Sequence, residues 1–189
     1  RAPQGERAAN GGGAGAGLIA GTGSAGLIYR HGQLHSCSGR GFPISDLGSG
    51  AWLGLRAIQQ SLLCHDGILP PSLLAVRLLD HFKRDQAEVV RWAARAIPAD
   101  YGRFAPWVFD AASDGDELAN QLLDETCAQL QTLLEGMGQL GADRIALLGG
   151  VGMRLAPRLG HLNLVPPQAD ALEGAILFAQ SEAYPCLHP

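Results

Sequence analysis

Four residues near the start of the chain, Gly21-Thr22-Gly23-Ser24, have types and spacing suited to binding an anion. They follow the short apolar run Leu18-Ile19-Ala20, which predicts a buried strand. Glycine lets the backbone adopt positive φ and approach a ligand closely, so successive amide groups can point at one anion. Thr22 and Ser24 add hydroxyl donors. The turn is therefore a candidate polyphosphate site, although the same glycines could serve only the geometry of a tight hairpin.

Two other phosphate-binding motifs compete for this turn. Residues 21–26 also satisfy G-x-G-x-x-G, the dinucleotide fingerprint, but that motif needs a helix to begin at once. Residues 27–36 instead have a β-like pattern, and no helical periodicity starts before Leu47. A Walker loop needs a lysine directly after its last glycine, whereas the single lysine, Lys83, follows a phenylalanine. The dinucleotide motif is therefore disfavoured, and a Walker loop is excluded.

A second glycine-rich segment spans residues 39–54 and contains Asp46. Its glycines leave backbone groups open to hydrogen bonding. A carboxylate such as that of Asp46 can accept hydrogen bonds from the adjacent hydroxyls of a sugar. Ser45 or Asp46 can also cap the first turn of the helix predicted to follow. For Asp46 the two roles can coexist.

A third segment, residues 147–152, places Gly149, Gly150 and Gly152 after an apolar run. Glycines directly after a buried strand let a flat ring lie against the backbone, and ligands favour the carboxyl ends of parallel strands. The segment is therefore a candidate nucleoside site. A βα turn that requires positive φ is the alternative.

The elements that must position these segments follow from hydrophobic periodicity. Continuous or alternating apolar runs predict strands at residues 18–20, 27–30, 33–36, 145–148 and 162–165. Apolar residues three and four apart predict helices over 47–62, 72–82, 85–97 and 116–135, one beginning near Pro106, a short one after Gly152 and a final one capped by Asp170. This order predicts an α/β domain with a mixed sheet.

Composition limits the function classes. The chain has 189 residues, 47% of them apolar, with 14 basic and 18 acidic residues for a net charge of −4. That balance argues against nucleic-acid and membrane partners. The four cysteines have no zinc or cluster spacing, and His31 and His35 lack a nearby third ligand, so we expect no metal site formed by side chains. Scattered cysteines are typical of reduced thiols in a cytoplasmic protein.

Taken in order, the segments resemble the N-acetylglucosamine kinase / BadF-type ATPase family of the actin-like ATPase superfamily. The resemblance rests on the turn at 21–24, on Asp46 within residues 41–54, on Gly115-Asp116 at the start of a long helix, on Gly149-Gly150-Val151, and on residues 170–175. It covers the chain from about residue 18. It implies a ribonuclease H-like (actin-like ATPase) lobe with a mixed sheet and an inserted helical bundle.

The resemblance also implies an activity, ATP- and Mg2+-dependent phosphorylation of an amino sugar, N-acetylglucosamine or glucosamine, at the 6-hydroxyl. By similarity, Gly21, Thr22, Gly23, Gly149, Gly150 and Arg154 would contact ATP, and Ser24, Gly39, Arg40, Gly41 and Asp46 would line the sugar side. We expect ATP and the sugar as small-molecule partners, and a homodimer.

The chain departs from the family pattern at positions that bear on sugar recognition. The family usually has Trp where Arg40 stands, Glu where Leu47 stands, and often Asn where Ala25 stands. Its first phosphate loop and its catalytic aspartate belong to a preceding lobe. We therefore expect residues 1–17 to be a flexible or truncated lead-in and residues 18–189 to be the C-terminal lobe, inactive alone, with the catalytic base outside this chain.

Two other functions stay open. One is an ATPase that activates a redox partner, which in that branch of the superfamily uses an iron–sulfur cluster held by cysteines. The other is a non-catalytic sugar-binding regulator.

Overall fold

The computed structural model describes residues 15–30, 33–162 and 164–167. Five strands, β1 (Gly15–Ala20), β2 (Ser24–Arg30), β3 (Gln33–Ser38), β4 (Ile145–Leu148) and β5 (Leu164–Val165), form one sheet in the order β3-β2-β1-β4-β5. The first three strands are antiparallel neighbours, while β4 runs parallel to β1 and β5 parallel to β4. The predicted mixed sheet is confirmed.

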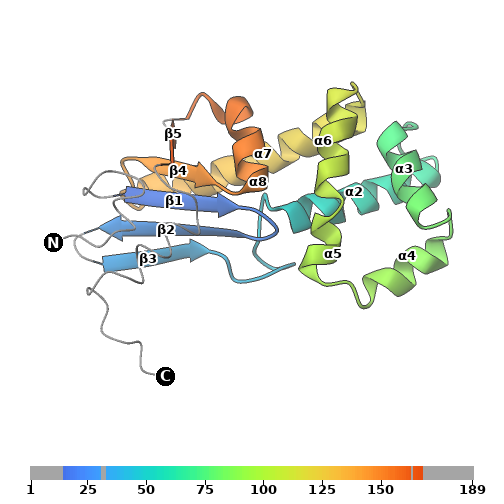
Figure 1. The fold of residues 1–189 in the computed structure, drawn as a ribbon, viewed down its shortest axis with the longest axis horizontal. Helices are drawn as coiled ribbons and strands as arrows, with labels where there is room; N and C mark the ends of the chain where they lie inside the picture. The colour runs from blue at the N-terminus through green and yellow to red at the C-terminus, as the bar shows by residue number, and fades with distance from the viewer. Residues whose placement is uncertain (1–14, 31–32, 163, 168–189) are drawn as a thin grey trace.

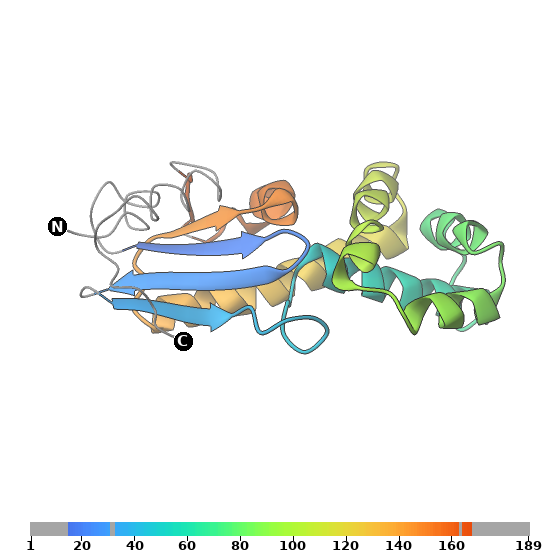
Figure 2. The ribbon, with the colours of Figure 1, turned by 60° about the horizontal axis from the view of Figure 1, so that its bottom comes forward.

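The described helices fall between β3 and β4 and directly after β4 (Figure 1). They are α2 (Gly50–His65), α3 (Leu73–His81), α4 (Gln86–Ala93), α5 (Pro98–Gly102), α6 (Ala105–Ser113), α7 (Glu117–Gln139) and α8 (Gly150–Leu155), followed by the 3-10 helix η1 (Ala156–Leu159). Figure 2 shows the sheet at one end and α3 to α6 at the other, with α7 running along one face of the sheet toward the helical end. The described part of the chain contains no helix long and apolar enough to cross a membrane.

The sheet and α7 enclose one part of the core. Leu18 and Ile28 of the sheet and Leu130, Leu134 and Met137 of α7 are all buried. The alternation along each strand brings one set of side chains to this face, and the three- and four-residue spacing along α7 forms the matching stripe.

The helical end is organised around aromatic rings. Phe82 and Phe104 are buried, and their ring centroids lie 5.2 and 5.7 Å from that of Trp92. Trp92 also lies 4.8 Å from Tyr101, and these pairs are edge-on or tilted, as aromatic quadrupoles favour. The cluster joins α3, α4, α5 and α6.

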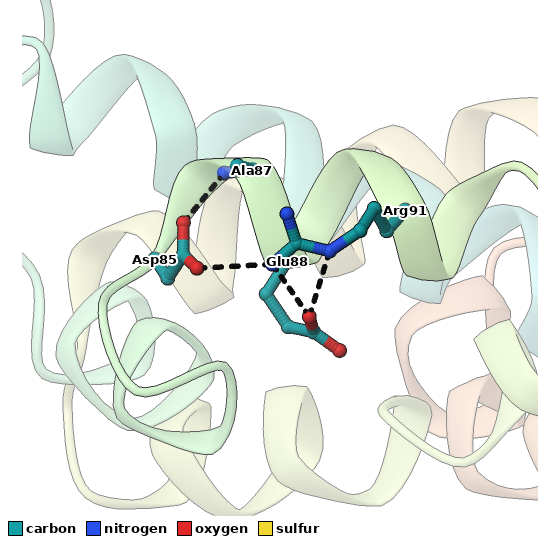
Figure 3. Close-up of polar contacts among 4 residues, drawn as sticks. All are labelled: Asp85, Ala87, Glu88 and Arg91. Atoms are coloured by element: carbon teal, nitrogen blue, oxygen red, sulfur yellow. Dashed lines mark hydrogen bonds and ion pairs between the residues drawn. The ribbon is translucent and has the colours of Figure 1, made fainter.

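The surface helix α4 is held by polar contacts at its start (Figure 3). The carboxylate of Asp85 accepts a hydrogen bond from the amide of Ala87 at 2.9 Å, so it caps the helix. Arg91 pairs with Asp85 at 3.1 Å and with Glu88 at 2.8 Å. All these side chains are largely exposed, so the contacts stabilise the helix only modestly.

Several predicted boundaries were wrong. The first strand begins at Gly15 rather than Leu18, so residues 15–17 belong to the sheet and not to a lead-in. The helix predicted over 85–97 ends at Ala93, and Ile97 is the exposed residue before α5. The proline at position 98 keeps Ile97 out of the helix, because the residue before a proline avoids helical backbone angles. The connection between the strands predicted at 27–30 and 33–36 and the helix predicted after Asp170 lie outside the described residues.

The start of α2 differs most from expectation. Ser49, and neither Ser45 nor Asp46, is its N-cap, because the Ser49 hydroxyl accepts the Trp52 amide at 3.1 Å. Leu47 therefore precedes the helix. This leaves the Asp46 side chain free of capping and lets it lie against the first glycine turn.

Candidate functional site

The turn of the β1–β2 hairpin directs two of its amide groups away from α2. The Gly50 amide donates to the Gly21 carbonyl at 2.7 Å, and the Ala51 amide donates to the Thr22 carbonyl at 3.0 Å. In a trans peptide the N–H points opposite to the C=O. The amides of Thr22 and Gly23 therefore point away from α2, and Thr22 is exposed. The turn is thus a tight hairpin whose outward amides are compatible with the predicted anion nest, which stays a prediction.

The end of β4 lies directly beside this turn. The parallel register pairs Ile19 with Leu148, so Gly149 lies next to the last residue of β1. Gly149 has φ of 86°, and a Cβ there would overlap the carbonyl oxygen of Ala20. Gly150 is exposed, and a Cβ on it would meet nothing within 4 Å. The first and third glycine segments therefore adjoin, and Gly150 leaves open surface at their edge.

Asp46 comes to the same turn from the second segment. It is half-buried with a φ of 20°, uncommon for a residue with a side chain. Its Oδ1 lies 3.4 Å from the Ser24 amide nitrogen, and a Cβ on Gly23 would lie 3.0 Å from its Oδ2. A glycine at position 23 thus lets a carboxylate approach the turn backbone closely.

Ser24 lies beneath the turn rather than at its surface. Only 2% of the residue is exposed, and its hydroxyl donates to the Leu47 carbonyl at 2.7 Å. Ser24 was predicted to line the sugar side. Its hydroxyl is buried and already donates a hydrogen bond within the protein.

The other predicted sugar-side residues occupy the exposed loop between β3 and Asp46. Gly39 and Gly41 have positive φ, 71° and 95°, and both are exposed, as is Arg40. A Cβ on Gly39 would lie 2.8 Å from that of Ala25, so this loop runs beside the start of β2. These three residues remain predicted sugar contacts.

Arg154 of α8 packs on α6. Its guanidinium carbon lies 4.0 Å from the centroid of the Phe109 ring, a cation–π contact, while the residue itself stays exposed. Its predicted role along the nucleoside remains a prediction.

Two groups of residues that adjoin the β1–β2 turn were not predicted from the sequence. One is the pair of α2 amides, from Gly50 and Ala51, whose signal was the Gly48-Ser49-Gly50 run before an apolar helix. The other is Gly102 of α5, where a Cβ would lie 3.4 Å from Thr22 Cγ2 and 3.8 Å from its Oγ1. No local pattern connects residue 102 with the turn, because tertiary packing alone brings α5 to it.

The described residues contain no group of three or more His, Cys, Asp or Glu side chains placed to hold a metal ion. Cys37, Cys64 and Cys127 are free thiols, and burial raises the pKa of each. Thiols with raised pKa are weak nucleophiles at neutral pH.

This sheet order, with glycine turns between β1 and β2 and after β4, defines the ribonuclease H-like lobe of the actin-like ATPases. The predicted fold class is confirmed. The sequence model of the BadF/BadG/BcrA/BcrD ATPase family matches residues 6–179, so the chain belongs to that family.

Two curated relatives and one solved structure show the similarity further. The chain is 45% identical over 168 residues to glucosamine kinase GspK of Vibrio cholerae, and 29% identical over 133 residues to N-acetyl-D-glucosamine kinase of Dictyostelium discoideum. These matches cover 87% and 67% of this chain, and 57% and 42% of the relatives. A crystal structure from Chromobacterium violaceum, provisionally named an N-acetylglucosamine kinase, is 34% identical with a TM-score of 0.80 over 94% of this chain and 63% of that one. The chain thus spans less than two thirds of the length of these relatives.

Proposed function

We propose that this chain binds ATP and an amino sugar, glucosamine or N-acetylglucosamine, and supports phosphoryl transfer to the sugar's 6-hydroxyl. One observation carries the proposal: the Thr22 and Gly23 amides point away from α2, next to the half-buried carboxylate of Asp46. The name of the 45% identical relative, a glucosamine kinase, supports the substrate class.

The nucleotide side is assigned from the two adjoining glycine turns. The outward amides and the exposed hydroxyl of Thr22 would bind the β- and γ-phosphates, because backbone N–H groups in such a nest favour negative charge. The nucleoside would lie along Gly149 and Gly150, with Arg154 beside it. Phosphoryl transfer depends chiefly on positioning and charge stabilisation, which this arrangement supplies.

On the sugar side, Asp46 would orient the acceptor. Its Oδ1 faces the Ser24 amide. Its remaining lone pairs can accept hydrogen bonds from sugar hydroxyls. Gly39, Arg40 and Gly41 would form the outer wall. We assign no base for the 6-hydroxyl proton to the described residues.

Mg2+ is expected to accompany ATP and neutralise its phosphates. Asp46 is the carboxylate that the described residues bring to the turn, and one of its oxygens faces the Ser24 amide. Since Mg2+ usually binds through one or two carboxylates together with substrate phosphates and water, the ion would be held here mainly by ATP, with Asp46 the carboxylate nearest the turn.

A cytoplasmic homodimer is also proposed. The free thiols of Cys37, Cys64 and Cys127 are consistent with a reducing compartment. Cell fractionation and light scattering of the purified protein test the location and the oligomeric state separately.

The family's description as ATPases supports a second candidate, ATP hydrolysis that drives a change in a protein partner. It predicts ADP release without sugar. The kinase predicts ADP release only with sugar.

The experiment that separates the two uses the full-length natural protein with ATP and Mg2+. ADP release is measured without sugar and with glucosamine, N-acetylglucosamine or glucose, and the product is identified by mass spectrometry and by NMR of the phosphorylated position. We expect release with an amino sugar and a 6-phosphate product. Release that no sugar stimulates would refute the kinase proposal.

A further inference from the structure

The sugar-side carboxylate and the phosphate turn share a single peptide group. The amide of Ser24 faces Asp46 Oδ1, while the carbonyl of the same peptide, that of Gly23, accepts the Gly21 amide at 2.9 Å and closes the turn. Because a peptide group is planar, its N–H and C=O cannot reorient independently. A shift of the Asp46 carboxylate is therefore transmitted to the hydrogen bond that closes the turn.

The backbone of Asp46 needs outside support to stay in place. A positive φ at a residue with a side chain is unfavourable and persists only when its surroundings enforce it. On the C-terminal side, the carbonyl of the next residue, Leu47, accepts the Ser24 hydroxyl at 2.7 Å. The carbonyl of Asp46 itself accepts the Ser49 amide at 3.2 Å.

Ser24 thus holds the Asp46 segment to the turn by two separate contacts: its amide faces the Asp46 carboxylate, and its hydroxyl donates to the carbonyl of the next residue, Leu47. It is only 2% exposed, so a substrate on the surface of the turn does not contact its hydroxyl directly. We propose that Ser24 is a positioning residue that couples sugar binding at Asp46 to nucleotide binding at the Thr22–Gly23 amides. This inference rests on the proposed function and specifies how its two substrates influence each other.

The coupling has a thermodynamic signature. If sugar contact steadies Asp46 and thereby the turn, sugar tightens nucleotide binding, and nucleotide must tighten sugar binding by the same factor. Without the Ser24 hydroxyl, the peptide between Leu47 and Gly48, one residue beyond Asp46, loses its anchor. The affinity for each substrate should then be independent of whether the other substrate is bound.

The test measures sugar affinity by calorimetry on the full-length protein, with and without a non-hydrolysable ATP analogue and Mg2+. We expect the analogue to tighten sugar binding in the wild type by roughly fivefold or more, the lower end of common allosteric coupling. In Ser24→Ala this factor should fall to below about twofold, with the affinity for the analogue alone changed little.

Ser61→Ala is the matched control. Ser61 is equally buried, at 1% exposed, and its hydroxyl also donates to a backbone carbonyl at 2.7 Å, but the bond lies within α2. The control should lose stability and keep the wild-type coupling. If Ser24→Ala does not fold, Ser24→Cys, of similar size with a weak donor, replaces it and should also lose coupling.

Three results would overturn the inference while leaving the kinase assignment intact: an active wild type without coupling, Ser24→Ala with wild-type coupling, or Ser61→Ala with an equal loss. A wild type that phosphorylates no amino sugar would instead refute the proposed function, and this inference with it.

Discussion

The amide nitrogen of Gly50 lies 2.7 Å from the carbonyl oxygen of Gly21, so the first residue of α2 fixes a peptide of the β1–β2 turn. Helix N-termini often bind anions directly through their free amides. Here the amides of Gly50 and Ala51 donate hydrogen bonds to carbonyl groups of the turn. The amides of Thr22 and Gly23 in the turn point away from the helix instead. The positive end of the helix dipole lies behind these groups and would add to the attraction that we propose they have for phosphate.

Asp46→Asn should change the KM for the amino sugar much more than the KM for ATP. The amide side chain has nearly the same size but loses the negative charge and half of the acceptor capacity. We expect the KM for the amino sugar to rise at least about tenfold, since hydrogen bonds to a charged group contribute about 1.5–3 kcal/mol. The KM for ATP should change less than threefold. Steady-state kinetics with each substrate varied in turn measures both.

Asp66→Asn provides the control, because Asp66 is exposed at the end of α2, far along the helix from the turn. It should leave both constants unchanged. An unchanged sugar KM in Asp46→Asn would remove Asp46 from the sugar site.

Gly149→Ala and Gly150→Ala form a second pair. Gly149 has a positive φ and its Cβ would overlap the Ala20 carbonyl, whereas Gly150 has space around it. We expect Gly149→Ala to lower the free energy of unfolding by more than about 2 kcal/mol, because strain and backbone displacement add. Gly150→Ala should stay within about 0.5 kcal/mol. Urea unfolding followed by circular dichroism measures the difference, and equal effects would show that the close approach of β4 and β1 does not constrain position 149.

The Asp116 carboxylate is a junction between two helices. Its Oδ1 accepts the Ala119 amide at 2.9 Å and caps α7, while its Oδ2 accepts the Leu73 amide at 2.8 Å at the start of α3 and the Ser72 hydroxyl at 2.9 Å. Burial alone raises the pKa of Asp116, but these hydrogen bonds, with one from Leu74, outweigh it and hold the pKa below its ordinary value.

The sign of the resulting pH dependence follows. A carboxylate with a lowered folded-state pKa binds protons more weakly when folded, so it stabilises the fold above its ordinary pKa of 3.8. That stabilisation is lost as the pH falls from there through the folded-state pKa. Asp116→Asn should therefore cost about 1–3 kcal/mol at pH 7 and less in acid.

Urea titrations at pH 7 and at several values below pH 4 measure this change. Asp114→Asn is the control, since Asp114 is exposed at the end of α6. A cost for Asp116→Asn that stays constant down to the lowest pH would contradict the assigned stabilisation.

Single segments could be predicted from the sequence better than the way in which they pack against one another. The strand at 145–148 and the glycines after it were predictable because a continuous apolar run followed by Gly-Gly has few other structures. The N-cap of α2 was not predictable, because Ser45, Asp46 and Ser49 are all residue types that cap helices well. Only the packing of α2 on the turn selects Ser49. The nearness of Gly102 to Thr22 depends on how α5 packs against α2, which no local pattern encodes.

Arg154→Gln tests the nucleotide side. The guanidinium of Arg154 lies over the Phe109 ring, which fixes one of its faces and leaves the exposed group near the open surface at Gly150. If it lies along the nucleoside, its loss should raise the KM for ATP about three- to tenfold, equivalent to the 0.5–1.5 kcal/mol typical of a stacking or cation–π contact. The sugar KM should stay within twofold. Arg158→Gln is the matched control, because Arg158 lies on the adjoining η1 and pairs with Asp124 of α7 at 2.6 Å. An ATP KM that responds equally to both substitutions would mean that Arg154 acts only through the packing of α8.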